Sequence, residues 1–305
     1  MHIHYIYPAD LPTVCGWLEA CTTSSDHIHC RQRIVPGDNF YKIRLIDLER
    51  LCIIESDSSE EYACLSYVWG DANLPRLSRT NLHDYTTPGK LDMNELESAS
   101  TIRDAIIVAM YLRIRYLWID CLCIIQDDEK DLSAHISNMD RIYGDAQLTI
   151  VSTAPSASSG IPGMSRTGSK SSEECRHRAV GKYLHALLRE NDVTSSPWYQ
   201  RAWTLQEMYF SRRLLIFDDY QTFFQCNHAT KTRHEWRQQS RLPTFLDQED
   251  KAIWHYLTLL RTYVKRELSH YLDIINAFAG ILSSFCVTVG ASTWGIPMHL
   301  SLIHI

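Results

Sequence analysis

The chain has 305 residues, enough for one large domain or two small ones. Hydrophobic side chains make up 45% of the sequence and charged side chains 22%, which excludes a disordered or fibrous chain. The 30 basic and 36 acidic side chains give a net charge of −6 without a basic cluster. We therefore expect no nucleic-acid partner, because phosphate binding needs clustered Lys and Arg.

The N-terminal segment, residues 1–40, is predicted to form a flap. It places Trp17, Cys21, His27, His29 and Cys30 close together. Cys and His at such spacings can bind zinc, but the intervals match no standard zinc finger. We therefore favour packing of the flap and expect no metal site.

Strands and helices alternate through the middle of the chain. Strands are predicted at Tyr41–Leu48, Tyr62–Val68, Tyr116–Ile119 and Ala146–Val151. Amphipathic helices are predicted between the last three strands, one with Ser100 as its N-cap and one marked by Leu132, Ile136, Met139 and Tyr143. Because parallel neighbours need a crossover and helices supply it, the sequence predicts an α/β fold with a doubly wound parallel sheet and flanking helices.

The later elements are less regular. Ser196 and Pro197 predict the start of a helix that runs to about Tyr209. Leu214–Phe217 and Thr222–Cys226 predict a β-hairpin, and helices are expected at 250–265 and 271–284.

The compartment is predicted from three further features. Ten cysteines are too few for a disulfide framework, which favours buried thiols in a reducing compartment. The first residues, MHIHYIYPADLP, lack the regions of a signal peptide. The last 32 residues carry no Asp, Glu, Lys or Arg, but polar residues interrupt them, whereas a spanning helix needs about 20 mostly apolar residues. We therefore expect a cytoplasmic protein without a membrane partner.

Three segments in register resemble the heterokaryon incompatibility (HET) domain of filamentous fungi. They are Tyr62–Asp71 (YACLSYVWGD), Tyr116–Gly144 (with YLWID and CIIQDD) and Trp198–Ser211 (WYQRAWTLQEMYFS). The resemblance implies a HET domain at 41–230 and a C-terminal helical extension at 231–305. Relatives generally continue into a long variable region, so we interpret the extension as either naturally short or truncated.

The resemblance implies a role in fungal non-self recognition, in which such domains trigger growth arrest and programmed cell death. Expected partners are other incompatibility or NLR-type proteins, or further copies of the same chain. HET domains are also similar to TIR domains, which implies a TIR-related, flavodoxin-like parallel sheet with a β-hairpin insertion and extra C-terminal helices.

The same similarity implies one site. In TIR proteins that cleave NAD, a Trp followed four residues later by a Glu lies on a helix beside the pocket, and Trp203 and Glu207 reproduce that spacing. Such a step places both side chains on one helical face. Glu207 is then the expected catalytic carboxylate, which can stabilise an oxocarbenium-like state, and Trp203 would stack on the nucleotide. NAD would be a substrate, and no cofactor is expected.

Three further residues are predicted to bind the substrate. Ser66, Asp71 and Asp120 lie at or just after the ends of predicted strands, and ligands bind outside the carboxyl ends of open parallel sheets. For Asp120, a structural role as a helix cap or in a turn is an equal alternative, because Asp is favoured in both.

Two functions remain open from the sequence. Glu207 could form an ordinary ion pair with Arg201, Arg212 or Arg213 instead of a catalytic site. The chain is accordingly either an effector that cleaves NAD or a death-signalling module that self-associates without turnover.

Overall fold

The computed structural model describes residues 11–31, 40–164 and 193–289, with gaps at 72, 92, 94–95, 220–221, 228–229, 232–235 and 238–248, and also 292–293 and 296–297. The strands are β1 (Lys42–Asp47), β2 (Cys52–Asp57), β3 (Tyr62–Ser66), β4 (Tyr116–Trp118), β5 (Leu148–Ser152), β6 (Arg213–Phe217), β7 (Thr222–Cys226), β8 (Thr230–Lys231), β9 (Trp236–Arg237), β10 (Ser292–Thr293) and β11 (Ile296–Pro297).

The α-helices within these ranges are α1 (Leu11–Thr23), α2 (Leu82–Thr86), α3 (Ser100–Tyr111), α4 (Asp120–Cys123), α5 (Glu129–Ile136), α6 (Met139–Asp145), α8 (Pro197–Gln200), α9 (Trp203–Phe210), α10 (Glu249–Tyr263) and α11 (Asn276–Val289). The 3₁₀ helices are η1 (Ser25–Cys30), η2 (Glu97–Ala99), η3 (Ala157–Ser159), η4 (Val193–Ser195) and η5 (Tyr271–Ile274).

One mixed sheet organises the fold, with the strand order β2-β1-β4-β3-β5-β6-β7-β8-β9. The four central strands, β4, β3, β5 and β6, pair in parallel, which confirms the prediction for three of them. Antiparallel strands flank them on both sides, including the predicted hairpin of β6 and β7. Numbered along the chain, the parallel strands lie in the order 2-1-3-4, which begins the flavodoxin-like order 2-1-3-4-5.

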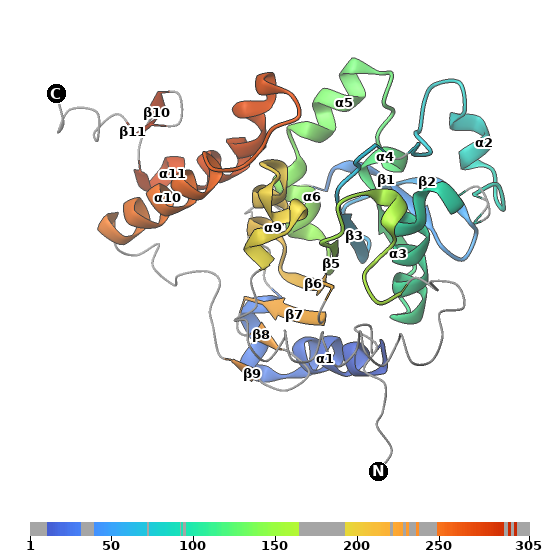
Figure 1. The fold of residues 1–305 in the computed structure, drawn as a ribbon, viewed down its shortest axis with the longest axis horizontal. Helices are drawn as coiled ribbons and strands as arrows, with labels where there is room; N and C mark the ends of the chain where they lie inside the picture. Colours follow the sequence, from blue (N-terminus) through green and yellow to red (C-terminus); the bar gives the residue numbers. More distant parts are fainter. Residues whose placement is uncertain are drawn as a thin grey trace, which may run out of the picture.

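The central strands are apolar because helices cover both of their faces. All five residues of β3, of β5 and of β6 are buried, as is typical of strands in a covered parallel sheet. Helix α3 lies on one face, and α6 and α9 pack together on the other (Figure 1). Helix α11 packs on α9 and α6, and α10 packs on α11, so the C-terminal helices add a further layer (Figure 1).

Two helices predicted as continuous are each broken, which corrects the sequence analysis. The segment from Leu132 to Tyr143 forms α5 and α6, because the side chains of Ser137 and Asn138 bond back to carbonyls of the preceding turn. The segment from Pro197 to Tyr209 forms α8 and α9. There the backbone of Gln200 and Ala202 bonds to Glu267 instead, at 2.6 and 2.8 Å.

Three smaller differences concern element boundaries. Ser100 is the first residue of α3 rather than its N-cap, whereas Ser196 caps α8 as predicted, accepting a hydrogen bond from the Tyr199 amide. The helix expected at 271–284 begins at Asn276, after the 3₁₀ turn η5. Strand β2 was not predicted; it pairs with β1 at the edge of the sheet.

Among the described residues, no helix combines the length and the apolar composition that crossing a bilayer requires.

Candidate functional site

The candidate site lies at the carboxyl ends of the parallel strands. Ser66 is the last residue of β3, and Asp120 follows β4 by two residues. Strands β4 and β5 lie on opposite sides of β3, so the direction of winding reverses between β3 and β5. In open α/β sheets, ligands bind in the crevice outside such a reversal point.

Glu207 approaches this point from α9. Its side chain is buried, with 8% of the residue exposed, and its carboxylate accepts a hydrogen bond from the Ser66 hydroxyl. The same hydroxyl accepts a hydrogen bond from Nε1 of the buried Trp198, at 2.7 Å. Ser66 therefore links the end of β3 to α8 and α9.

The electrostatics of Glu207 favour its neutral form. Burial raises its pKa to about 7, although the Ser66 hydrogen bond and the positive charge of Arg201 oppose the rise. The negative charge of Asp120 adds to the rise. A carboxyl group with this pKa can hold or release a proton near neutral pH.

Among the described residues, Glu207 forms no ion pair with Arg201, Arg212 or Arg213, which the sequence left open as an alternative. Nη1 of Arg201 donates to the backbone carbonyl of Tyr67, the residue that follows β3, at 2.7 Å. Arg212 donates to the carbonyl of Asp145, the last residue of α6, at 2.7 Å, and Arg213 donates to the carbonyl of Gln147, which precedes β5, at 3.0 Å. Each of the three arginines thus donates to a backbone carbonyl, and the Ser66 hydroxyl donates to the Glu207 carboxylate.

Asp120 has a hydrogen-bond network of its own. Its carboxylate accepts hydrogen bonds from Nε1 of Trp69 at 2.9 Å, the hydroxyl of Tyr67 at 3.1 Å and the amide of Cys121 at 2.7 Å. Burial raises its pKa, and these three donors oppose that rise. Asp120 and Glu207 are therefore two carboxyl groups that interact electrostatically at one end of the sheet.

Arg266, which belongs to the C-terminal extension, interacts electrostatically with Glu207. Nη1 of Arg266 donates to the Thr204 hydroxyl at 2.9 Å, and its guanidinium carbon lies 4.0 Å from the centre of the Tyr199 ring. Its Nε and Nη2 atoms are buried and have no hydrogen-bond partner among the described residues. Two donors are thus left for an anionic group.

The remaining predicted site residues are Asp71 and Trp203. Asp71 is exposed in the turn after β3 and is not among the hydrogen-bonding partners described above. Trp203 is half-buried at the first position of α9, where it packs against the apolar core. The structure therefore joins Ser66 directly to Glu207, places Asp120 within their electrostatic field and leaves Asp71 at the surface.

Sequence reasoning missed Trp198, Tyr67 and Arg266. Trp198 and Tyr67 stand inside the motif segments, so their position in those segments was an available signal. Arg266 offered none, because it comes from the extension and reaches the site through the tertiary fold.

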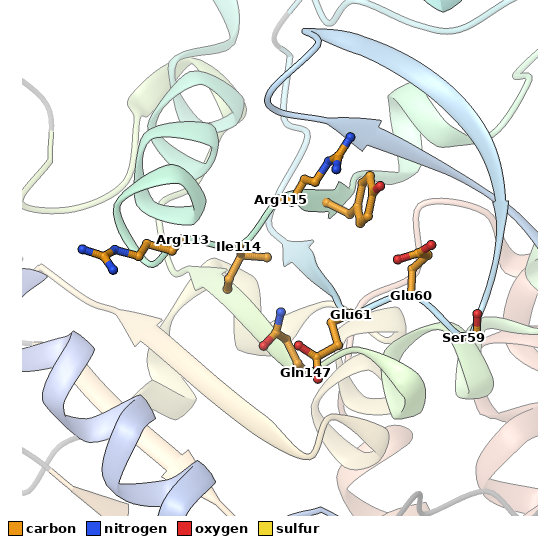
Figure 2. Close-up of a pocket in the computed structure, with 8 residues that line it drawn as sticks. Ser59, Glu60, Glu61, Arg113, Ile114, Arg115 and Gln147 are labelled. Atoms are coloured by element: carbon orange, nitrogen blue, oxygen red, sulfur yellow. The ribbon is translucent and has the colours of Figure 1, made fainter.

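One pocket lies elsewhere in the molecule, with a volume of about 340 Å³ (Figure 2). Glu60 and Glu61, which precede β3, line it together with Arg113, Arg115 and neighbouring residues. These residues stand at the amino ends of the parallel strands, so this pocket is at the opposite end of the sheet from Glu207.

Comparison with known proteins agrees with the motifs. Residues 62–207 match the family model described as Heterokaryon incompatibility protein (HET). This part of the chain is similar to HET domains. The match runs from the first residue of β3 to Glu207, and so contains Ser66, Asp120 and Glu207.

A relative and a structural search complete the comparison. The chain is 24% identical over 242 residues to heterokaryon incompatibility protein 6, OR allele, of Neurospora crassa. That alignment covers 61% of this chain and 34% of the relative, so this chain spans only about a third of the relative's length. No solved structure matches the chain, and the relation to TIR domains stays a prediction.

Proposed function

We propose that this chain triggers programmed cell death in fungal non-self recognition, and that it does so by cleaving NAD. The similarity to HET domains and the N. crassa relative support the role in heterokaryon incompatibility. Other incompatibility or NLR-type proteins, or a second copy of this chain, are the proposed partners, and the cytoplasm is the proposed compartment.

The observation that carries the proposal is the state of the Glu207 carboxyl group. It is buried, accepts a hydrogen bond from the Ser66 hydroxyl, has a pKa of about 7 and lies where the winding of the parallel sheet reverses. Cleavage breaks the bond between ribose C1′ and the nicotinamide nitrogen, whose ring takes up the electron pair. Water then bonds to C1′ and releases a proton. The ionised Glu207 carboxylate would stabilise the oxocarbenium-like state between these events.

Neighbouring groups suit the rest of the substrate. The two unpartnered donors of Arg266 would take the pyrophosphate, because guanidinium groups bind phosphate oxygens in pairs. Trp203 would stack on a ring of the nucleotide, and Ser66 and Asp120 would bind ribose hydroxyls. Asp71, exposed in its turn, would contact the substrate at the rim of the site.

The second candidate is a self-associating module without turnover, and one observation favours it. Around η5, the apolar side chains of Tyr271, Leu272, Ile274 and Ile275 are exposed. Exposed apolar patches mark interaction sites in many proteins. In this alternative the hydrogen bond between Ser66 and Glu207 has a purely structural role.

Expression in a fungal host separates the two candidates. Wild type, Glu207→Gln and the control Glu55→Gln, which alters an exposed residue of β2, are induced at equal levels. The proposal predicts growth arrest and NAD depletion with wild type and Glu55→Gln but with neither effect for Glu207→Gln. Loss of a preorganised electrostatic contact at a reacting centre commonly costs about 10²–10³ in rate. Equal arrest in all three strains, with NAD unchanged, would favour self-association.

A further inference from the structure

Four side chains of metal-ligand type meet where the N-terminal segment packs on the sheet. Cys21 comes from α1, His27 and Cys30 from η1, and Cys226 from the end of β7. Their ligand atoms all lie within 4.8 Å of one another. All four residues are buried: the three cysteines are fully buried and His27 is 7% exposed.

We propose that Cys21, His27, Cys30 and Cys226 bind one zinc ion. Three thiolates and one imidazole are a recognised donor set for structural zinc, which takes four ligands in a tetrahedron. With Zn–S of about 2.3 Å and Zn–N of about 2.05 Å, tetrahedral geometry places nitrogen and sulfur roughly 3.5 Å apart. Nδ1 of His27 lies 3.4 Å from Sγ of Cys226 and 3.7 Å from Sγ of Cys30, on either side of that distance.

The surroundings of the cluster suit a charged metal–thiolate centre. Nε of the buried Arg213 donates to Sγ of Cys21 at 3.2 Å, and its Nη1 donates to the carbonyl of Gln147 at 3.0 Å. Three thiolates and Zn²⁺ carry one net negative charge, which the Arg213 guanidinium would balance. Donors around the first ligands orient them and tune the metal.

The cluster also explains the arrangement of the N-terminal segment. Helix α1 packs beside β7 (Figure 1), and Cys226 stands 199 residues from His27 in the sequence. A zinc ion would join these distant segments by coordination bonds and secure α1 and η1 to the sheet. Four protein ligands leave no open position for a substrate, so the ion would be structural.

This proposal replaces the expectation of no metal site. The intervals among Cys21, His27 and Cys30 alone were irregular, and the fourth ligand comes from a hairpin that sequence spacing does not connect to them. His29, which the sequence places beside them, is exposed and does not belong to the cluster.

Metal analysis of the full chain tests the proposal. Protein expressed with zinc and purified without chelator is predicted to contain about one zinc per chain. Cys226→Ser and His27→Ala should contain less than about a tenth of that, since each loses a ligand of a four-coordinate site. His29→Ala and Cys52→Ser are the controls and should keep one zinc. Cys52 is a buried thiol of β2 outside the cluster.

Cobalt substitution keeps the test decisive where a variant fails to fold. Wild type reconstituted with Co²⁺ should show the intense d–d bands of a tetrahedral ion and sulfur-to-cobalt charge-transfer bands. Folded wild type without zinc and without these bands would overturn the proposal. So would a full zinc content in Cys226→Ser, or a disulfide among Cys21, Cys30 and Cys226 found by peptide mass analysis of unreduced protein.

Discussion

The Glu207 carboxyl group occupies a position that is costly for a charge. It is removed from water, its bonded partner is the neutral hydroxyl of Ser66, and Asp120 adds a second negative charge nearby. Burial and the Asp120 charge favour the protonated acid and outweigh the Ser66 hydrogen bond, which favours the ionised form, so the pKa of Glu207 lies at about 7. Buried carboxyl groups shifted in this way are more common at functional sites than elsewhere.

The pKa of Glu207 predicts a specific dependence of stability on pH. Because the folded-state pKa is raised from 4.5 to about 7, the folded protein keeps a proton that the unfolded chain loses. The contribution of Glu207 to the free energy of unfolding is therefore largest below pH 4.5, falls as the pH rises towards 7 and stays low above pH 7. At 1.36 kcal/mol per unit the loss is about 3 kcal/mol.

Glu207→Gln removes that titration. The free energy of unfolding of the variant minus that of wild type should increase by about 3 kcal/mol between pH 4.5 and pH 8, as measured by urea unfolding. Glu55→Gln, at an exposed position, should show no such change with pH. A change for Glu207→Gln no larger than that of Glu55→Gln would mean that Glu207 ionises like an exposed carboxyl group.

Helix α11 approaches α9 and α6 closely at one glycine. The Gly280 amide donates to Oε1 of Gln206 at 2.9 Å. A Cβ atom at Gly280 would lie 2.6 Å from Cβ of Asp140, 2.9 Å from Oε1 of Gln206 and 3.1 Å from the ring of Phe210. The packing of α11 on α6 and α9 therefore requires a residue without a side chain here.

Gly280→Ala should destabilise the protein by about 1–3 kcal/mol, because helices or side chains must shift to admit the methyl group. Gly16→Ala is the matched control. Gly16 lies inside α1 with nothing within 4 Å of its added Cβ, so the change should stabilise by about 0.5–1 kcal/mol. Urea unfolding at pH 7 measures both. Equal effects of the two substitutions would contradict the close approach of α11.

The strands were more predictable than the helix boundaries. Apolar runs such as Tyr62–Val68 and Ala146–Val151 identify buried strands, and the helical segments between them require parallel pairing. The breaks between α5 and α6 and between α8 and α9 leave no trace in the apolar spacing. The first depends on local bonds from Ser137 and Asn138, and the second on a backbone partner, Glu267, that is distant in sequence.

At the scale of the whole molecule, the sheet brings together groups that the sequence keeps apart. Ser66, Asp120 and Glu207 were predictable because strand ends and motif segments contain them. Arg266 and Cys226 were not, because their neighbours are set by how the C-terminal extension and the hairpin pack on the rest of the chain. The parallel order 2-1-3-4 then places the candidate site outside the carboxyl ends of the central strands, where flavodoxin-like folds bind ligands.

The most direct test of NAD cleavage is nicotinamide release from NAD by the purified chain, compared between wild type and Glu207→Gln. We predict release by wild type that rises with pH to a plateau above about pH 7, where Glu207 is ionised. The folded Glu207→Gln variant should be slower by about 10²–10³-fold. Equal release by the two proteins, or none above the buffer rate from folded wild type at any of these pH values, would contradict the role assigned to Glu207.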